Sequence, residues 1–248
     1  MKSAILLALV VIVTHGQAAK LPESFPLCKR KDPNLDNCLR NAIEKSIREL
    51  KPGLPSLQML PLDPLDITQI TIRDGINRPV NIKLDLNNAV AKGLSGVNIF
   101  TVRADIDKGT ISADGVLPFA TLESDYEMDG RFLVLPIKGK GKSKLTFTGM
   151  NATINLESKI ETKNGKGYWN VDKLVLVIKE MDNFQINFEN LFNGDKALGD
   201  NTNKILNENW RDFWKELKPA FEETFGQVFL HLSRLIFSKV PLNDIFLE

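Results

Sequence analysis

The chain has 248 residues, of which 43% are hydrophobic and 25% are charged, and this ordinary globular composition argues against disorder. Its 32 basic and 31 acidic residues leave a formal net charge of only +1. Proteins that bind nucleic acid usually carry a basic excess, so the charge balance gives no reason to expect a nucleic-acid partner.

The first 18 residues are expected to be a signal peptide. An apolar run over residues 4–13 follows a basic start, and Gly16 and Ala18 have the small side chains that a signal peptidase reads. The run is too short to span a bilayer as a helix, and no later segment is long and apolar enough. We predict cleavage before Ala19, leaving residues 19–248 as a single secreted, extracellular domain without a transmembrane segment.

Cys28 and Cys38 are the two cysteines of the chain. An oxidising compartment favours a disulfide between them. Closing so short a loop would stabilise the fold by roughly 2–3 kcal/mol on the chain-entropy estimate. A metal site built on the two thiolates is the alternative, but no histidine lies nearby in the sequence to complete its ligands. We expect no metal site and no cofactor.

The segment after the cysteines is predicted to be a helix from about Asp36 to Leu50. Its apolar residues recur at helical spacing, and Pro52 and Gly53 end the pattern. The next segment contains three prolines and is predicted to be an extended loop that leads into a strand.

Between Ile67 and Phe188 the apolar period changes to two. Alternation of this kind is typical of antiparallel strands with one polar and one apolar face. Several runs exceed the usual strand length of about 5–6 residues, so the predicted sheet is long and curved. The clearest apolar series are Met150, Ala152, Ile154 and Leu156, and later Phe184, Ile186 and Phe188.

A long helix is predicted from Thr202 to Phe237, with a bend near Pro219. If continuous, it would be about 54 Å long at 1.5 Å per residue. Its apolar side chains cover about half of the circumference, which is wider than the stripe of an ordinary surface helix. Such a helix needs an apolar sheet wrapped along it.

Asparagines crowd the predicted start of this helix. Asp200, Asn201 and Thr202 each suit a helix N-cap. Asn203 and Asn207 lie one turn apart on one face, where their amides could bond to the backbone of a strand end or loop. We therefore expect these two residues to dock the helix onto the sheet.

The stretch FENLFNGDKALGDNTNKILNENW, residues 188–210, resembles the C-terminal motif of the takeout family, insect relatives of the haemolymph juvenile hormone-binding proteins. The paired cysteines and the segment LPLDPLDI match as well, and the resemblance covers essentially the whole mature chain. It implies an α+β tubular lipid-binding fold, with a long C-terminal helix wrapped by a highly curved antiparallel sheet around an apolar tunnel. It also implies transport or sequestration of a small hydrophobic ligand, such as a terpenoid or a fatty acid, by a protein that is not an enzyme.

The tunnel lining is expected to come from three strand segments and from the helix stripe. A register slip of one residue would exchange the two faces of a strand, so the strand set depends on the register. The predicted ligand-binding residues are Ile154, Leu156, Leu174, Leu176, Phe184 and Ile186 on the strands, with Trp210, Phe213, Leu217, Phe221 and Phe225 on the helix.

Other functional interpretations find less support. His231 would be the single histidine of the mature chain and is predicted to be a packed core or rim residue. Asp63 and Asp66 could form an acid–base pair, although solvated charge explains them equally simply. No nucleophile elbow or phosphate loop is present, so no catalytic residue is assigned.

Two surface features remain. Lys138, Lys140, Lys142 and Lys144 alternate, and we interpret them as a solvated hairpin edge, with weak attraction to anionic membranes as the alternative. Asn151 begins the chain's N-x-S/T sequon and is a candidate for glycosylation on an outward face. The alternative to a monomeric carrier is a secreted interaction module that contacts a protein partner or a membrane surface and has no tunnel.

Overall fold

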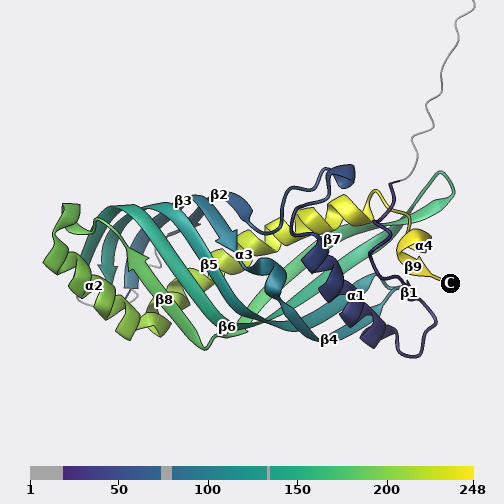
Figure 1. Ribbon diagram of the computed structural model, residues 1–248, viewed down its shortest axis with the longest axis horizontal. Coiled ribbons are helices and arrows are strands. Elements are labelled where there is room, and N and C mark those ends of the chain that lie inside the picture. The colour runs from purple at the N-terminus through teal and green to yellow at the C-terminus, as the bar shows by residue number, and fades with distance from the viewer. Residues whose placement is uncertain (1–18, 74–79, 133–134) are drawn as a thin grey trace, which may run out of the picture.

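The computed structural model describes residues 19–73, 80–132 and 135–248, so the predicted signal peptide lies outside the described residues. The molecule is elongated, and a curved sheet wraps along one long helix, α3 (Trp210–Phe237). Figure 1 shows helix α2 (Lys196–Glu208) at one end of the sheet and helix α1 (Leu35–Glu49) lying across the sheet near the other end. The predicted long helix wrapped by a curved sheet is confirmed.

Two long central strands run the length of the sheet. β5 (Thr110–Phe132) has 23 residues and β6 (Leu135–Lys163) has 29, and they pair from Thr110 opposite Glu157 to Phe132 opposite Leu135. Every pairing in this sheet is antiparallel. The strand prediction is therefore confirmed.

Different short strands flank this central pair at its two ends. At the α2 end the order is β2 (Leu65–Ile72), β3 (Val80–Lys92), β5, β6 and β8 (Asn183–Phe188). At the α1 end β5 instead pairs with β4 (Asn98–Asp105), and β6 pairs with β7 (Lys166–Glu180). The interior at the α2 end and the interior at the α1 end therefore have different walls, and we refer to these two regions as compartments.

Gly149 shifts the inward-facing series of β6 by one residue. Leu145 and Phe147 are buried in the interior before it, whereas Met150 and Ala152 face the interior after it. Gly149 has φ +64°, and an added Cβ would collide with the Asp182 carboxylate, so a side chain is excluded here. A strict period of two therefore cannot hold along the whole of this strand.

The helix expected over Thr202 to Phe237 is not continuous, because Asn209 interrupts it with φ −116° and ψ 33°. The Asn209 side chain donates to the Ile205 carbonyl at 2.9 Å, a local bond that competes with regular helix geometry. The predicted N-cap at residues 200–202 is also wrong. Helix α2 begins at Lys196, and the Asp195 side chain caps it by accepting from the Leu198 amide at 3.0 Å. Pro219 lies inside α3, and a bend there stays a prediction.

Asn203 and Asn207 dock α2 onto the sheet, as predicted. Asn203 accepts from the Phe188 amide and donates to the Phe188 carbonyl, both at 2.9 Å. Asn207 accepts from the Ile186 amide at 2.9 Å and donates to the Ile186 carbonyl at 2.7 Å. Each side-chain amide thus pairs with β8 as a neighbouring strand would, on the edge that faces away from β6.

The N-terminal strand β1 (Cys28–Lys29) and the C-terminal strand β9 (Phe246–Leu247) lie side by side at the α1 end of the molecule. The disulfide between Cys28 and Cys38 is confirmed, with a Cα–Cα distance of 5.9 Å, and it ties β1 to α1. β1 pairs in parallel with β9, which follows the short helix α4 (Leu242–Ile245). Single 3₁₀ turns, η1 (Pro55–Leu57), η2 (Leu94–Gly96) and η3 (Phe192–Gly194), complete the described elements.

Candidate functional site

A cavity of about 410 Å³ lies beneath α1, whose residues form part of its wall. Its walls come from α1, from the second half of α3, and from strands β5, β6 and β7. The segment before β1 and the C-terminal β9 contribute Phe25 and Phe246 to the wall. The volume falls within the range of about 300–1,000 Å³ that is typical of small-molecule sites.

The lining of this cavity is almost wholly apolar. No charged side chain of the described residues lines it, and Ser46, Thr121 and Ser233 are the lining residues with hydroxyl groups. The Ser233 hydroxyl donates to the Phe229 carbonyl at 2.8 Å, so its hydrogen is already bonded within α3. Burying a charge in such a place would cost several kcal/mol. The cavity therefore suits an apolar molecule.

The structure brings part of the predicted ligand-binding set together at this cavity. The predicted residues that line it are Ile154, Leu156, Leu174, Leu176, Phe221 and Phe225. Their role in binding stays a prediction, but their inward orientation agrees with the register expected from the sequence. The tight pairing of Ile154 with Leu176 and of Leu156 with Leu174 across β6 and β7 explains why they lie together.

The other predicted ligand-binding residues do not line the cavity. They are Phe184, Ile186, Trp210, Phe213 and Leu217, and they pack at the α2 end, where side chains fill the interior. The Phe213 ring, for example, meets the rings of Phe132 at 5.8 Å and of Phe188 at 6.2 Å between centroids. Apolar residues on one helix stripe thus serve as solid core in one compartment and as cavity wall in the other.

The filled compartment also contains a phenol without charge. The Tyr126 hydroxyl donates to the Glu189 carbonyl at 2.7 Å. Burial, together with the nearby Glu189 charge, raises the pKa of Tyr126 to about 12. The Tyr126 phenol therefore stays neutral at physiological pH and adds no charge to the filled compartment.

The sequence prediction missed the cover formed by α1 and the segment before β1. Leu39 and Ala42 of α1 are buried against the cavity, and Leu21 and Phe25 close its edge next to α3. The signal was present, because the helical stripe of α1 needs an apolar partner. Its partner could not be identified without the sheet curvature.

Residues 5–247 match the family described as haemolymph juvenile hormone binding protein. The chain belongs to this family. By its description the family is one of binding proteins.

Relatives of this family member include the circadian clock-controlled protein daywake of Drosophila melanogaster, 24% identical over 235 residues that cover 91% of this chain and 88% of the relative. A putative beta-carotene-binding protein of Schistocerca gregaria is 22% identical over 216 residues, covering 86% and 84% of the two chains. The crystal structure of takeout 1 from Epiphyas postvittana matches with a TM-score of 0.80 and 28% identity, over 90% of this chain and 100% of that one. These similarities confirm the takeout resemblance and the fold class.

Asp63 of this family member has a structural role instead of the acid–base role considered above. Its carboxylate accepts from the amides of Gly93 at 3.0 Å and Ser95 at 3.1 Å, and from the Ser95 hydroxyl at 2.5 Å. Burial would raise the pKa of Asp63, but these hydrogen bonds outweigh it and lower the pKa. Asp66 is exposed on β2. The two carboxylates therefore form no pair, and Asp63 instead anchors the turn at η2.

The four alternating lysines share one face, but they are not a hairpin edge. Each pairs across β5 with the carboxylate directly opposite in the register, for example Lys142 with Asp125 at 2.5 Å and Lys140 with Glu127 at 3.3 Å. On its other side this part of β6 is covered, because Asn190 donates to the Lys140 carbonyl at 2.7 Å. Each lysine thus has a carboxylate partner on β5, and weak attraction to anionic membranes stays a prediction.

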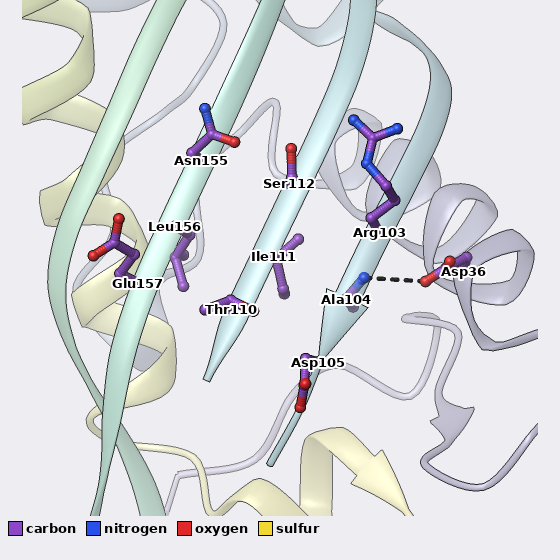
Figure 2. A pocket seen from close by; sticks show the side chains of 10 residues that line it. All are labelled: Asp36, Arg103, Ala104, Asp105, Thr110, Ile111, Ser112, Asn155, Leu156 and Glu157. Carbon is purple, nitrogen blue, oxygen red and sulfur yellow. Dashed lines mark hydrogen bonds between the residues drawn. The ribbon is translucent and has the colours of Figure 1, made fainter. Parts of the chain in front are cut away.

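A second hollow, of about 440 Å³, lies on the surface where α1 meets β4, β5 and β6. Figure 2 shows its side chains, including the Asp36 carboxylate that accepts from the Ala104 amide at 3.1 Å. Its other charges have partners beside the hollow: Arg103 pairs with Asp114 at 3.2 Å, Asp105 with Lys108 at 2.7 Å and Glu157 with Lys173 at 4.0 Å. The hollow is open and polar, and we assign it no ligand.

His231 is exposed on α3, so the prediction that it is a packed residue is wrong; its position falls on the solvent side of the helix. Among the described residues, no group of three or more His, Cys, Asp or Glu side chains could hold a metal ion. In the same part of the chain no helix is both long and apolar enough to cross a membrane.

Proposed function

We propose that this protein is a secreted, monomeric, non-enzymatic carrier that encloses one small hydrophobic molecule, such as a terpenoid, a fatty acid or a similar lipid, in the cavity beneath α1. The observation that carries the proposal is the interior cavity of about 410 Å³ without a charged side chain of the described residues in its wall. A packed structural module has no need of such a space, since interiors are normally filled to the density of organic crystals.

Burial would supply most of the affinity. A ligand that loses about 400 Å² of apolar surface to the cavity gains about 10 kcal/mol at 25 cal/mol per Å². Part of this gain offsets the loss of translational and rotational freedom, which amounts to at least about 4 kcal/mol. Because no lining charge of the described residues takes part, affinity should depend weakly on salt concentration.

Two comparisons support a hydrophobic ligand. The matched family is described by the binding of juvenile hormone in haemolymph. The locust relative is described as a putative β-carotene-binding protein. Both descriptions belong to those proteins, and they favour a carrier over an enzyme for this chain. Cleavage of residues 1–18 before Ala19 would place the carrier outside the cell.

A ligand panel with two variants at one position tests the proposal. Purified protein is titrated with terpenoids, fatty acids and quinones, and binding is followed by tryptophan fluorescence, since Trp214 packs against Phe221 at 5.4 Å between ring centroids. Phe221→Asp places a carboxylate in the lining and should abolish binding. Phe221→Leu keeps the lining apolar and should weaken binding by about tenfold, the effect of losing roughly 1.4 kcal/mol of contact.

The matched control is Phe213→Leu, which makes the same change two turns earlier on the same helix. Phe213 is fully buried but does not line the cavity, so its variant should keep the dissociation constant of the wild-type protein. Circular dichroism and thermal unfolding establish that each variant is folded. Well-folded wild-type protein that takes up no member of the panel would rule the proposal out.

A further inference from the structure

The cavity ends at a wall of aromatic rings. On the α2 side of the wall the interior is filled, and large side chains such as Phe132, Phe188 and Phe213 are at most 2% exposed. On the α1 side the next aromatic residues of the same helix, Phe225 and Phe229, are only partly buried and line the open cavity. The change from filled to open interior takes place within one turn of α3.

Four rings from three elements make up this wall. Phe147 of β6 lies at its centre and stacks on Phe184 of β8, with 5.1 Å between centroids. It also meets Trp214 at 5.9 Å and Phe221 at 5.7 Å, both on α3. Trp214 in turn contacts Phe221 at 5.4 Å and Phe184 at 5.4 Å.

The four rings form two layers. Phe147 and Phe221 line the cavity, whereas Phe184 and Trp214 do not and stand behind them. All four are at most 8% exposed. A ligand that reaches this end of the cavity therefore meets the front pair, and the back pair prevents the front rings from turning away.

We propose that the front pair, Phe147 and Phe221, sets the maximum length of ligand that the cavity accepts, and that Phe184 and Trp214 hold this pair in place. The proposal rests on the proposed carrier function and adds to it the residues that determine specificity for ligand length. It assigns Phe147, which lies outside the ligand-binding set predicted from the sequence, a direct role in ligand selection.

Packing physics predicts a sharp limit in place of a gradual one. Each methylene that fits in the cavity removes apolar surface from water and tightens binding by about fourfold. The first methylene that does not fit must displace a ring in a close-packed core or bend back on the chain, because such cores resist insertion of extra volume. Affinity should therefore rise with chain length up to one length and then fall.

Removing a front ring should extend the cavity toward the back pair. Apolar space opened in a protein interior by truncation stays dry and accepts apolar ligands. A chain too long for the wild-type cavity could then place its end in the volume that the Phe221 or Phe147 ring occupied. Trp214 and Phe184 would become the new end of the cavity.

The experiment measures dissociation constants for a homologous series of straight-chain primary alcohols, because they are uncharged and differ only in length. For the wild-type protein we expect affinity to rise about fourfold per methylene up to a limiting length and then to fall. Phe221→Leu and Phe147→Leu should move the limit to longer chains, and Phe221→Ala and Phe147→Ala should move it further. A chain just beyond the wild-type limit should bind at least tenfold more tightly to the Phe221→Ala variant.

The matched control is Phe229→Leu, which also enlarges the cavity but lies two turns along α3, away from the wall. It should change the dissociation constants of all lengths together and leave the limiting length where it is. Thermal unfolding and near-ultraviolet circular dichroism establish folding, and the leucine variants carry the test if an alanine variant does not fold.

The outcomes separate the two proposals. If the wild-type protein binds neither the alcohols nor any member of the earlier panel, the carrier function itself is wrong. If the wild-type protein binds the alcohols without a limiting length, or if Phe221→Leu and Phe147→Leu both keep the wild-type limit, the carrier function stands and the ring wall does not measure ligand length.

Discussion

The side-chain amides of Asn203 and Asn207 on α2 bond to the backbone of β8, and removing them should lower the stability of the fold by a predictable amount. Asn207→Ala removes the bonds to the Ile186 amide at 2.9 Å and carbonyl at 2.7 Å, together with a bond to the Asn203 carbonyl at 2.7 Å. A net contribution of about 1 kcal/mol for each bond gives a loss of about 3 kcal/mol. Asn203→Ala removes the two bonds to Phe188 and should cost about 2 kcal/mol.

The assay is urea or thermal denaturation, with Asn201→Ala as the control. Asn201 is exposed on the same helix, and its replacement should change the stability by less than about 0.5 kcal/mol. For a domain of this size about 3 kcal/mol corresponds to a fall in Tm of about 6–12 °C. Hydrogen exchange at the Ile186 amide should also accelerate in Asn207→Ala. An Asn207→Ala variant as stable as Asn201→Ala would refute the view that these amides act as a substitute strand.

Four further predictions concern the disulfide, the Asp63 anchor and the processing of the chain. Joint replacement of Cys28 and Cys38 by alanine should lower the free energy of unfolding by about 2–3 kcal/mol, measured by denaturation of the folded variant. Asp63→Asn should be less stable than wild type at neutral pH. Because the pKa of Asp63 is lowered in the folded protein, this difference should persist above the unfolded value of 3.8 and shrink as the pH falls through the folded pKa, and a difference that grows in acid would contradict it. Secreted protein should begin at Ala19 by intact mass and lose mass on enzymatic deglycosylation if Asn151 carries a glycan.

The sequence predicted the elements of this fold better than their interruptions. Apolar alternation identified β3, the second half of β6 and β8, because these segments have one polar and one apolar face. It could not predict the shift of face at Gly149, since an alternating pattern does not indicate where one residue takes a positive φ. The break at Asn209 was missed because the apolar helical pattern continues across it, although Asn209 itself leaves helical geometry and its side chain bonds to the Ile205 carbonyl.

Only part of the predicted ligand-binding set lines the cavity, because the strands and helices that face α3 differ between its two ends. Phe213 and Phe221 have the same side chain, and both lie on the buried, apolar half of α3. The first is enclosed by aromatic rings of β5 and β8, whereas the second borders open space beneath α1. Whether an inward apolar residue packs or lines a cavity is decided by the volume of the side chains opposite, and a single sequence does not state which these are.

The most direct measurement of the central proposal is native mass spectrometry of the secreted protein, followed by extraction with organic solvent and identification of the compound released. A carrier should be a single chain that holds one small hydrophobic molecule, and Phe221→Asp prepared in the same way and shown by circular dichroism to be folded should be empty. Folded wild-type protein that is empty after purification, and that also stays empty after incubation with terpenoids, fatty acids and quinones, would contradict the carrier function.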